Sequence, residues 1–145
     1  MVTTLNDGRF LIKPGATAAR DYGNYFERII WDPQSDILVA HRSQFARYDS
    51  VAMTLQSGRV LILGGDSAQV GYTPFAPYPD ELFDPAIGSS FVAPFPLLKR
   101  RLYYSLITAV LLQDGRVLVL NGEDKGSTVN AIAETYVPPP PGTRR

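Results

Sequence analysis

Residues able to carry chemistry are few in this sequence of 145 residues, and none falls into a catalytic spacing. There is no cysteine and a single histidine, His41, which excludes disulfides, thiolate metal sites, cysteine nucleophiles and any site built from two histidines. His41 stands among polar residues, so we expect it on the surface rather than as a base. No serine lies in a nucleophile elbow, and Gly64-Gly65-Asp66 lacks the lysine and the helix of a phosphate-binding loop. The sequence therefore favours a protein that is not an enzyme.

Aromatic side chains gather in the longest loop that the sequence predicts, between Gly65 and Glu81. Tyr72, Phe75 and Tyr78 are interspersed there with prolines. An aromatic loop stiffened by proline is suited to ligand binding, and the alternative is that it covers the neighbouring strands. We keep both interpretations and take this loop as the candidate binding loop, for a protein or a glycan.

An internal repeat indicates the elements that would position these residues. A Gly-Arg pair between apolar stretches occurs at Gly8, Gly58 and Gly115, which are 50 and 57 residues apart. A second motif is an aromatic residue followed two positions later by proline, and its proline comes 25, 27 and 23 residues after these glycines. Two motifs in the same order at similar distances indicate repeated structural units. The second motif reads Trp31-Asp32-Pro33, Phe83-Asp84-Pro85 and Tyr136-Val137-Pro138.

Each unit is predicted to be a set of antiparallel strands joined by tight turns. Glycine supplies the positive φ that a hairpin turn needs, and the short flanking runs of Val, Ile, Leu and Thr favour strands. Residues 60–63 and 117–120 are apolar on both faces, so we expect both strands to be covered on both sides. We take Gly64 and Gly65, like the turn glycines, as structural. Four strands per repeat predict an all-β fold, a partial β-propeller of about three four-stranded antiparallel blades.

These motifs resemble the kelch repeats of the galactose oxidase-like β-propellers. The resemblance implies blades at about 1–45, 46–99 and 100–137, followed by a Pro-rich tail or linker over 138–145. Kelch blades occur in enzymes and in binding modules alike. The segments that carry the resemblance are Arg47-Tyr48-Asp49-Ser50, Gly64-Gly65, Glu81-Leu82-Phe83-Asp84-Pro85, Arg101-Leu102-Tyr103-Tyr104-Ser105, Asp114-Gly115-Arg116-Val117 and Glu134-Thr135-Tyr136-Val137-Pro138.

The same resemblance shows where a copper site would lie. The galactose and glyoxal oxidases have a Tyr-His-Ser segment before the hairpin, which supplies a tyrosine and a histidine to copper. Here the segment is Tyr103-Tyr104-Ser105, with Tyr104 in the histidine position. The second tyrosine of that family is linked to a cysteine, and this chain has none. Tyr103 and Tyr104 are therefore candidate vestigial copper-site positions, and we expect no metal and no cofactor.

Composition narrows the possible partners. The chain is 45% hydrophobic and 19% charged, which permits a buried core. Its 14 basic and 14 acidic residues balance, so we expect no nucleic-acid partner. No apolar stretch is long enough for a membrane span, and the first residues do not form a signal peptide. We expect a soluble chain, cytoplasmic by default, and extracellular if it is a fragment of an oxidase-like protein.

A stack of three sheets leaves outer faces and strand edges bare. We therefore expect self-association, or the rest of a larger propeller, as a partner of this chain. The predicted function is a non-catalytic kelch-type propeller segment that binds or scaffolds. The competing hypothesis is an incomplete or degenerate copper-radical oxidase acting on alcohols, aldehydes or carbohydrates, with Tyr103 as a ligand. A third is carbohydrate binding through the Tyr72 loop.

Overall fold

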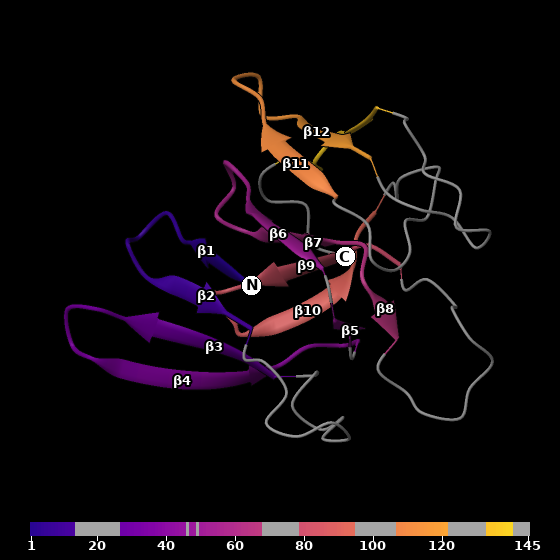
Figure 1. Cartoon of the computed structure of the whole chain (residues 1–145). Coiled ribbons are helices and arrows are strands. Elements are labelled where there is room, and N and C mark those ends of the chain that lie inside the picture. Colours follow the sequence, from indigo (N-terminus) through magenta and orange to yellow (C-terminus); the bar gives the residue numbers. More distant parts are fainter. Residues whose placement is uncertain are drawn as a thin grey trace.

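The computed structural model describes residues 1–13, 27–45, 47–48, 50–67, 79–94, 107–121 and 133–140. Every regular element in these segments is a β-strand, and the strands form antiparallel sheets (Figure 1). The all-β fold expected from the sequence is confirmed. The segments that the structure describes contain no helix long and apolar enough to cross a membrane.

The first sheet contains four strands in chain order. The third strand of this sheet ends at Asp32, directly before Pro33. The Asp32 carboxylate stabilises the turn that follows, because it accepts hydrogen bonds from the backbone N–H of Gln34 at 2.9 Å and from the hydroxyl of Ser35 at 2.8 Å. Its strands are β1 (Val2–Thr4), β2 (Phe10–Ile12), β3 (Glu27–Asp32) and β4 (Ile37–Arg42).

The second sheet is built in the same way, and a short strand pair extends its first hairpin. β5 and β8 pair in the register of β6 and β7, since Tyr48 faces Asp66 just as Val51 faces Leu63. Gly64 and Gly65, with φ of 61° and 84°, interrupt the ladder between the two pairs. The strands are β5 (Arg47–Tyr48), β6 (Val51–Thr54), β7 (Val60–Leu63), β8 (Asp66–Ser67), β9 (Glu81–Asp84) and β10 (Ser89–Val92).

The third sheet has three strands in the described residues, where the repeat predicts four. They are β11 (Thr108–Leu111), β12 (Val117–Leu120) and β13 (Glu134–Tyr136). After β13 the chain continues through residues 137–140, which belong to no strand. Prolines occupy positions 138 to 140, and proline has no N–H to donate to a sheet.

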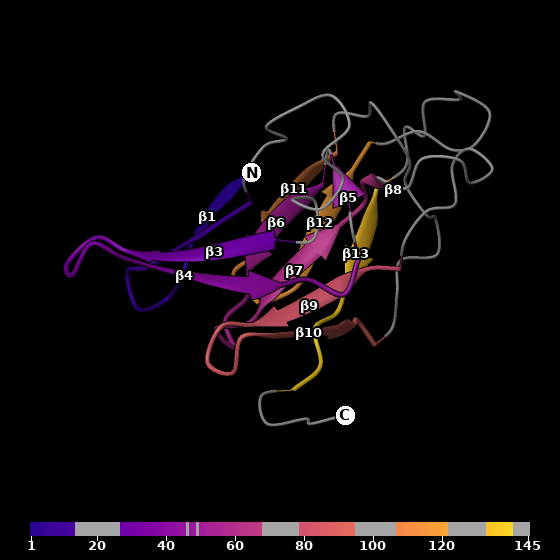
Figure 2. The same ribbon diagram turned by 90° about the horizontal axis from the view of Figure 1, so that it is seen from below.

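The three sheets stack face to face, with the second between the other two (Figures 1 and 2). Strand β6 contacts both β1 and β11, so the first strands of the sheets lie side by side, as the inner strands of propeller blades do. Each interface contains its own hydrophobic cluster. The cluster between the first and second sheets contains Leu5, Leu11, Ile30, Val60, Ile62 and Phe83. The one between the second and third contains Leu55, Leu61, Leu63, Leu82, Ala93, Ile107, Val117, Val119 and Tyr136.

The two strands expected to be covered on both faces differ in the structure. All four residues of β7 are buried, because sheets lie on both of its sides, and this prediction is confirmed. For β12 the prediction is wrong. Val117 and Val119 are buried against the second sheet, whereas Leu118 and Leu120 on the opposite face are only half-buried. The alternation arises because, among the residues that the structure describes, the third sheet packs against another sheet only on the face of Val117 and Val119.

Candidate functional site

The aromatic residues singled out from the sequence lie outside the described residues. This applies to the binding-loop candidates Tyr72, Phe75 and Tyr78, and to the copper-site positions Tyr103 and Tyr104. Their roles stay predictions. The candidate site that the structure does describe lies at the end of the sheets where the hairpin turns of Gly8, Gly58 and Gly115 are.

The three hairpin turns have the same backbone geometry. In each, the leucine N–H donates to the carbonyl of the arginine four residues later, and the glycine N–H donates back to the leucine carbonyl. Gly8, Gly58 and Gly115 have φ of 87°, 84° and 85°, which residues with a Cβ rarely adopt. This is the turn type in which a left-handed glycine closes a three-residue loop. The turns therefore present equivalent side chains at one end of the stack.

Consecutive turns are connected by side-chain amides. Asn6 Nδ2 in the first turn donates to the carbonyl oxygen of Leu55 in the second, at 3.4 Å. Gln56 Nε2 in the second turn donates to the carbonyl oxygen of Gln113 in the third, at 3.1 Å. The same turn position donates in both cases, and always to the following repeat. The turns thus form one continuous surface.

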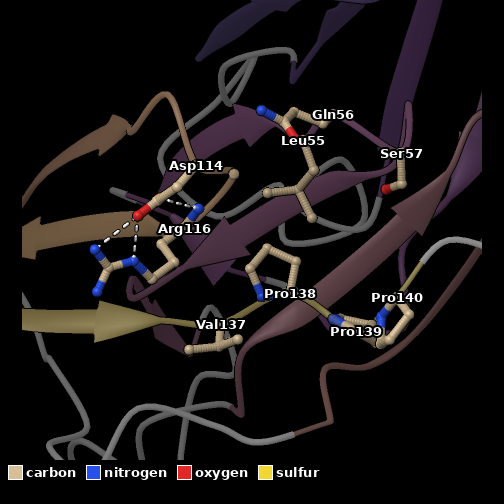
Figure 3. Close-up of a pocket in the computed structure, with 10 residues that line it drawn as sticks. Leu55, Gln56, Ser57, Asp114, Arg116, Val137, Pro138, Pro139 and Pro140 are labelled. Carbon is tan, nitrogen blue, oxygen red and sulfur yellow. Dashed lines mark hydrogen bonds and ion pairs between the residues drawn. The ribbon is translucent and has the colours of Figure 1, made fainter.

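A groove opens between the second and third turns, with a cavity volume of about 210 Å³. Figure 3 shows Leu55 pointing towards Pro138 across it, with the Asp114–Arg116 ion pair at one side. The lining combines amide and hydroxyl groups with apolar side chains. It consists of Leu55, Gln56, Ser57, Asp114, Gly115, Arg116, Val137, Pro138, Pro139 and Pro140.

A second groove of the same construction lies between the first and second turns, with a volume of about 300 Å³. Like the first, it is bounded by two turns and by the aromatic-x-Pro segment of the later repeat. Ser57 belongs to both grooves. The lining is Leu5, Asn6, Asp7, Arg9, Ser57, Gly58, Asp84, Pro85 and Ala86.

The arginines of the first and third turns pair with the aspartate two residues earlier. Arg9 Nη2 lies 2.7 Å from Asp7 Oδ2, and Arg116 Nη2 lies 2.7 Å from Asp114 Oδ2. The guanidinium hydrogen bonds lower the pKa of both aspartates. A proton donor at neutral pH needs a raised pKa, so a shift in the opposite direction makes these carboxylates unsuited to proton donation.

The second turn differs because Ser57 replaces the aspartate. Arg59 instead reaches across the sheet to Asp84, with 3.2 Å between Nε and Oδ2, and its guanidinium lies 5.2 Å from the centre of the Phe91 ring. Both members of this pair are mostly buried. Because the second turn has serine where the others have aspartate, its arginine pairs with the aromatic-Asp-Pro motif and not with a residue of its own turn.

A buried polar cluster connects the first and second sheets at the other end of the strands. Glu81 Oε1 accepts hydrogen bonds from the Ser43 hydroxyl and from the Gln44 N–H, the latter at 3.4 Å. Glu81 Oε2 lies 3.4 Å from Nη2 of Arg47, which also donates to the carbonyl of Pro79 at 2.7 Å. The carboxylate therefore joins the segment after β4 to β5 and β9.

Arg28 lies fully buried near this cluster, on the face of β3 that also carries Ile30. Burial lowers its pKa to about 10, and the charge of Glu81 opposes this shift. No motif in the sequence singles out Arg28 or Ser43. The available signal was the alternation of β3, which places Arg28 on the same face as the buried Ile30.

The expectation that His41 lies on the surface is wrong. His41 is half-buried between the first two sheets. Its ring lies 5.8 Å from that of Phe83 in an edge-on arrangement, and a Cβ at Gly88 would overlap the imidazole. The described residues contain no group of three His, Cys, Asp or Glu side chains that could hold a metal ion. His41 therefore packs against the next sheet.

No protein-family model matches the chain, and no curated protein matches it closely enough to count as a relative.

Proposed function

We propose that this chain is a non-catalytic, kelch-type propeller segment of the galactose oxidase-like kind, and that it acts as a binding or scaffolding module. Three equivalent hairpins, and strands β3, β9 and β13 that end at the aromatic-x-Pro motif, support the proposal. Charged side chains of the described residues form ion pairs: Asp7 with Arg9, Asp114 with Arg116, and Glu81 with Arg47. Such pairs fix the structure rather than activate a nucleophile or an acid.

The binding surface is the turn end of the stack, and its ligand is an extended segment of another protein. The observation that carries this is the recurrence of one groove design between successive turns. Gln56 and Ser57 offer amide and hydroxyl groups to a peptide backbone, while Leu55 and the proline rings receive an apolar side chain. Volumes of about 210 and 300 Å³ suit single side chains better than a whole small molecule.

Selection of phage-displayed random peptides on the purified chain tests this function. Calorimetry then compares a selected peptide on the wild type, on Ser57→Trp and on Gln34→Trp. Ser57 is exposed and lines both grooves, so the indole fills them, whereas Gln34 is exposed in the β3–β4 turn and lines neither groove. We expect at least a tenfold loss of affinity, about 1.4 kcal/mol, for Ser57→Trp alone.

Equal affinity for the two variants would remove the grooves as the site. Failure to enrich any peptide, together with glycan retention that depends on Tyr72, Phe75 or Tyr78, would favour the carbohydrate-binding alternative.

The competing proposal is the copper-radical oxidase. It predicts that added copper produces a tyrosyl-radical absorption and peroxide from alcohols or aldehydes, and that Tyr103→Phe abolishes both. The complete absence of cysteine and the single histidine, His41, which packs against Phe83, favour the binding module over this alternative. Peroxide production that is lost in Tyr103→Phe would overturn the non-catalytic proposal.

A further inference from the structure

Each sheet in the stack has two distinct faces, and the repeat determines which face meets which. We call the face that carries Leu11, Leu61 or Leu118 the forward face, and the face that carries Phe10, Val60 or Val117 the back face. Leu11 packs with Val60, so the forward face of the first sheet covers the back face of the second. Leu61 packs with Val117, so the same arrangement joins the second sheet to the third. The described part of the chain contains this interface twice.

On the forward face, equivalent residues are buried in the first and second sheets and more exposed in the third. Leu5 and Leu55 are 3% and 2% exposed, whereas Leu112 at the same turn position is half-buried. Leu11 and Leu61 are completely buried, whereas Leu118 is half-buried. Val110, next to Leu118 in the sheet, is 46% exposed. The forward face of the third sheet is therefore an apolar surface of the kind that is covered elsewhere in this chain.

Equivalent back positions lose their cover only in the first sheet. Val60 and Val117 are completely buried, whereas Phe10 is half-buried. Ile62 and Val119 are likewise buried, and Ile12 is not. Val2, which pairs with Ile12, is 62% exposed. Each end of the stack thus exposes the surface that the other end is built to cover.

The side-chain amides of the turns reach in the same direction along the stack, from each turn to the next. A Cβ added to Gly58 would meet Asn6, and one added to Gly115 would meet Gln56, but nothing lies within 4 Å of the equivalent point at Gly8. At the other end Gln113, which occupies the donor position of Asn6 and Gln56, is exposed. A third sheet placed on a first sheet would bring the Gln113 amide to the first turn, near Gly8.

We propose that this chain associates head to tail with a second copy of itself, the forward face of the third sheet of one copy packing on the back face of the first sheet of the other. The argument is continuity with the interface that the chain already forms twice. The contact is heterologous, so it closes into a ring or continues as an open stack. Two copies of three sheets give six, within the range of about 4–8 blades at which propellers close. The net charge of zero opposes no such contact.

The test uses one lysine substitution in each face, at positions that are exposed in the single chain so that folding is retained. Val2→Lys alters the back face of the first sheet, and Val110→Lys alters the forward face of the third. Ile87→Lys is the matched control, since Ile87 is 69% exposed in the turn between β9 and β10. Sedimentation and circular dichroism are measured for each protein alone and for the two face variants mixed in equal amounts.

We expect the wild type and Ile87→Lys to sediment at a multiple of the single-chain mass. Val2→Lys and Val110→Lys alone should sediment as single chains, and their mixture should recover a complex. Recovery is specific to a head-to-tail contact, because the mixture contains one intact forward face and one intact back face. A wild type that stays a single chain would overturn the proposal. So would a complex that only one of the two substitutions abolishes, since that result indicates a symmetric contact or another occupant.

Discussion

Glu81 shows how a charged residue can be part of the core between stacked sheets. Glu81 is completely buried, and its two oxygens serve different purposes, one for the Ser43 hydroxyl and one for the Arg47 guanidinium. Such a carboxylate costs free energy to desolvate, and its hydrogen bonds and nearby cations offset that cost. The result is a contact between sheets that depends on one specific charge at one specific position.

Glu81→Gln is therefore expected to be strongly destabilising. The amide keeps the shape and a hydrogen-bond acceptor for Ser43, but removes the negative charge that faces the buried guanidinium groups of Arg28 and Arg47. The free energy of unfolding in urea should fall by about 3 kcal/mol. Asp114→Asn is the control, because Asp114 pairs with an arginine on the surface, and it should unfold close to the wild type. Equal effects would mean that the buried charge is not needed.

Tyr136 should make the chain sensitive to alkaline pH. It is 1% exposed, and its hydroxyl has no hydrogen-bond partner among the described residues. Burial, with the nearby charge of Asp80, raises its pKa well above the usual range. Its contribution to stability is fully present below the unfolded-state pKa of about 10 and is lost as pH rises towards the folded-state value.

Tyr136→Phe keeps the packing and removes the ionisable group. The variant should match or slightly exceed the wild type in stability at neutral pH. Above about pH 10 its urea midpoint should fall less steeply than that of the wild type, which carries the same other tyrosines. Parallel alkaline limbs for the two proteins would contradict the assignment.

At the scale of elements, the hairpins are nearly identical in backbone but differ in what lies beside them. A Cβ on Gly115 would approach Gln56 Oε1 at 2.8 Å, whereas the corresponding point on Gly8 is open. Both glycines have φ near 85°, so the conformational strain of a substitution is equal at the two positions. This pair separates the cost of the turn from the cost of the contact between turns.

Gly8→Ala is expected to cost about 1 kcal/mol, from strain at positive φ alone. Gly115→Ala should cost about 1 kcal/mol more, because Gln56 must move and its hydrogen bond to the Gln113 carbonyl is lost. Urea titration of both variants measures the difference. Both glycine variants are best compared in a chain that also carries Val2→Lys, so that self-association does not contribute to the free energy of unfolding. Equal losses would show that the amide contact between turns adds nothing to stability.

At the scale of the whole molecule, β7 is the centre of the stack. Its four residues divide between the two hydrophobic clusters, with Val60 and Ile62 in one and Leu61 and Leu63 in the other. The outer strand β4 is the opposite case: Ile37 is 57% and Leu38 is 63% exposed. Local opening requires less buried apolar surface to be exposed at the edge than at the centre.

Native-state hydrogen exchange should therefore be slowest at the backbone amides of β7 that pair with β6 and β9, and much faster in β4. β11 is an edge strand of the third sheet, and its Val110 lies on the exposed forward face. Exchange in β11 should be intermediate in a single chain and should slow when the chain associates. Val110→Lys would remove that slowing without affecting β7. Uniform protection across the three sheets would indicate that they do not form a graded stack.

The sequence determined the local structure of this protein. The hairpins at Gly8, Gly58 and Gly115 and the strands that end before Pro33 and Pro85 follow from positive φ, the missing proline N–H and apolar alternation. All of these act within a few residues of the chain. The all-β fold and the stacked sheets could be predicted from them, because the strand over residues 60–63 is apolar on both faces and both are covered.

Features that involve two repeats at once were decided only by the tertiary structure. The cover of β7 on both faces and of β12 on one, the grooves shared by consecutive turns, and the meeting of Glu81 with Ser43 and Arg47 all join segments far apart in the sequence. Local sequence patterns specify that a face is apolar or that a strand carries a charge. Which surface or countercharge meets it depends on how the sheets stack, and for that reason the candidate site could not be found from spacing alone.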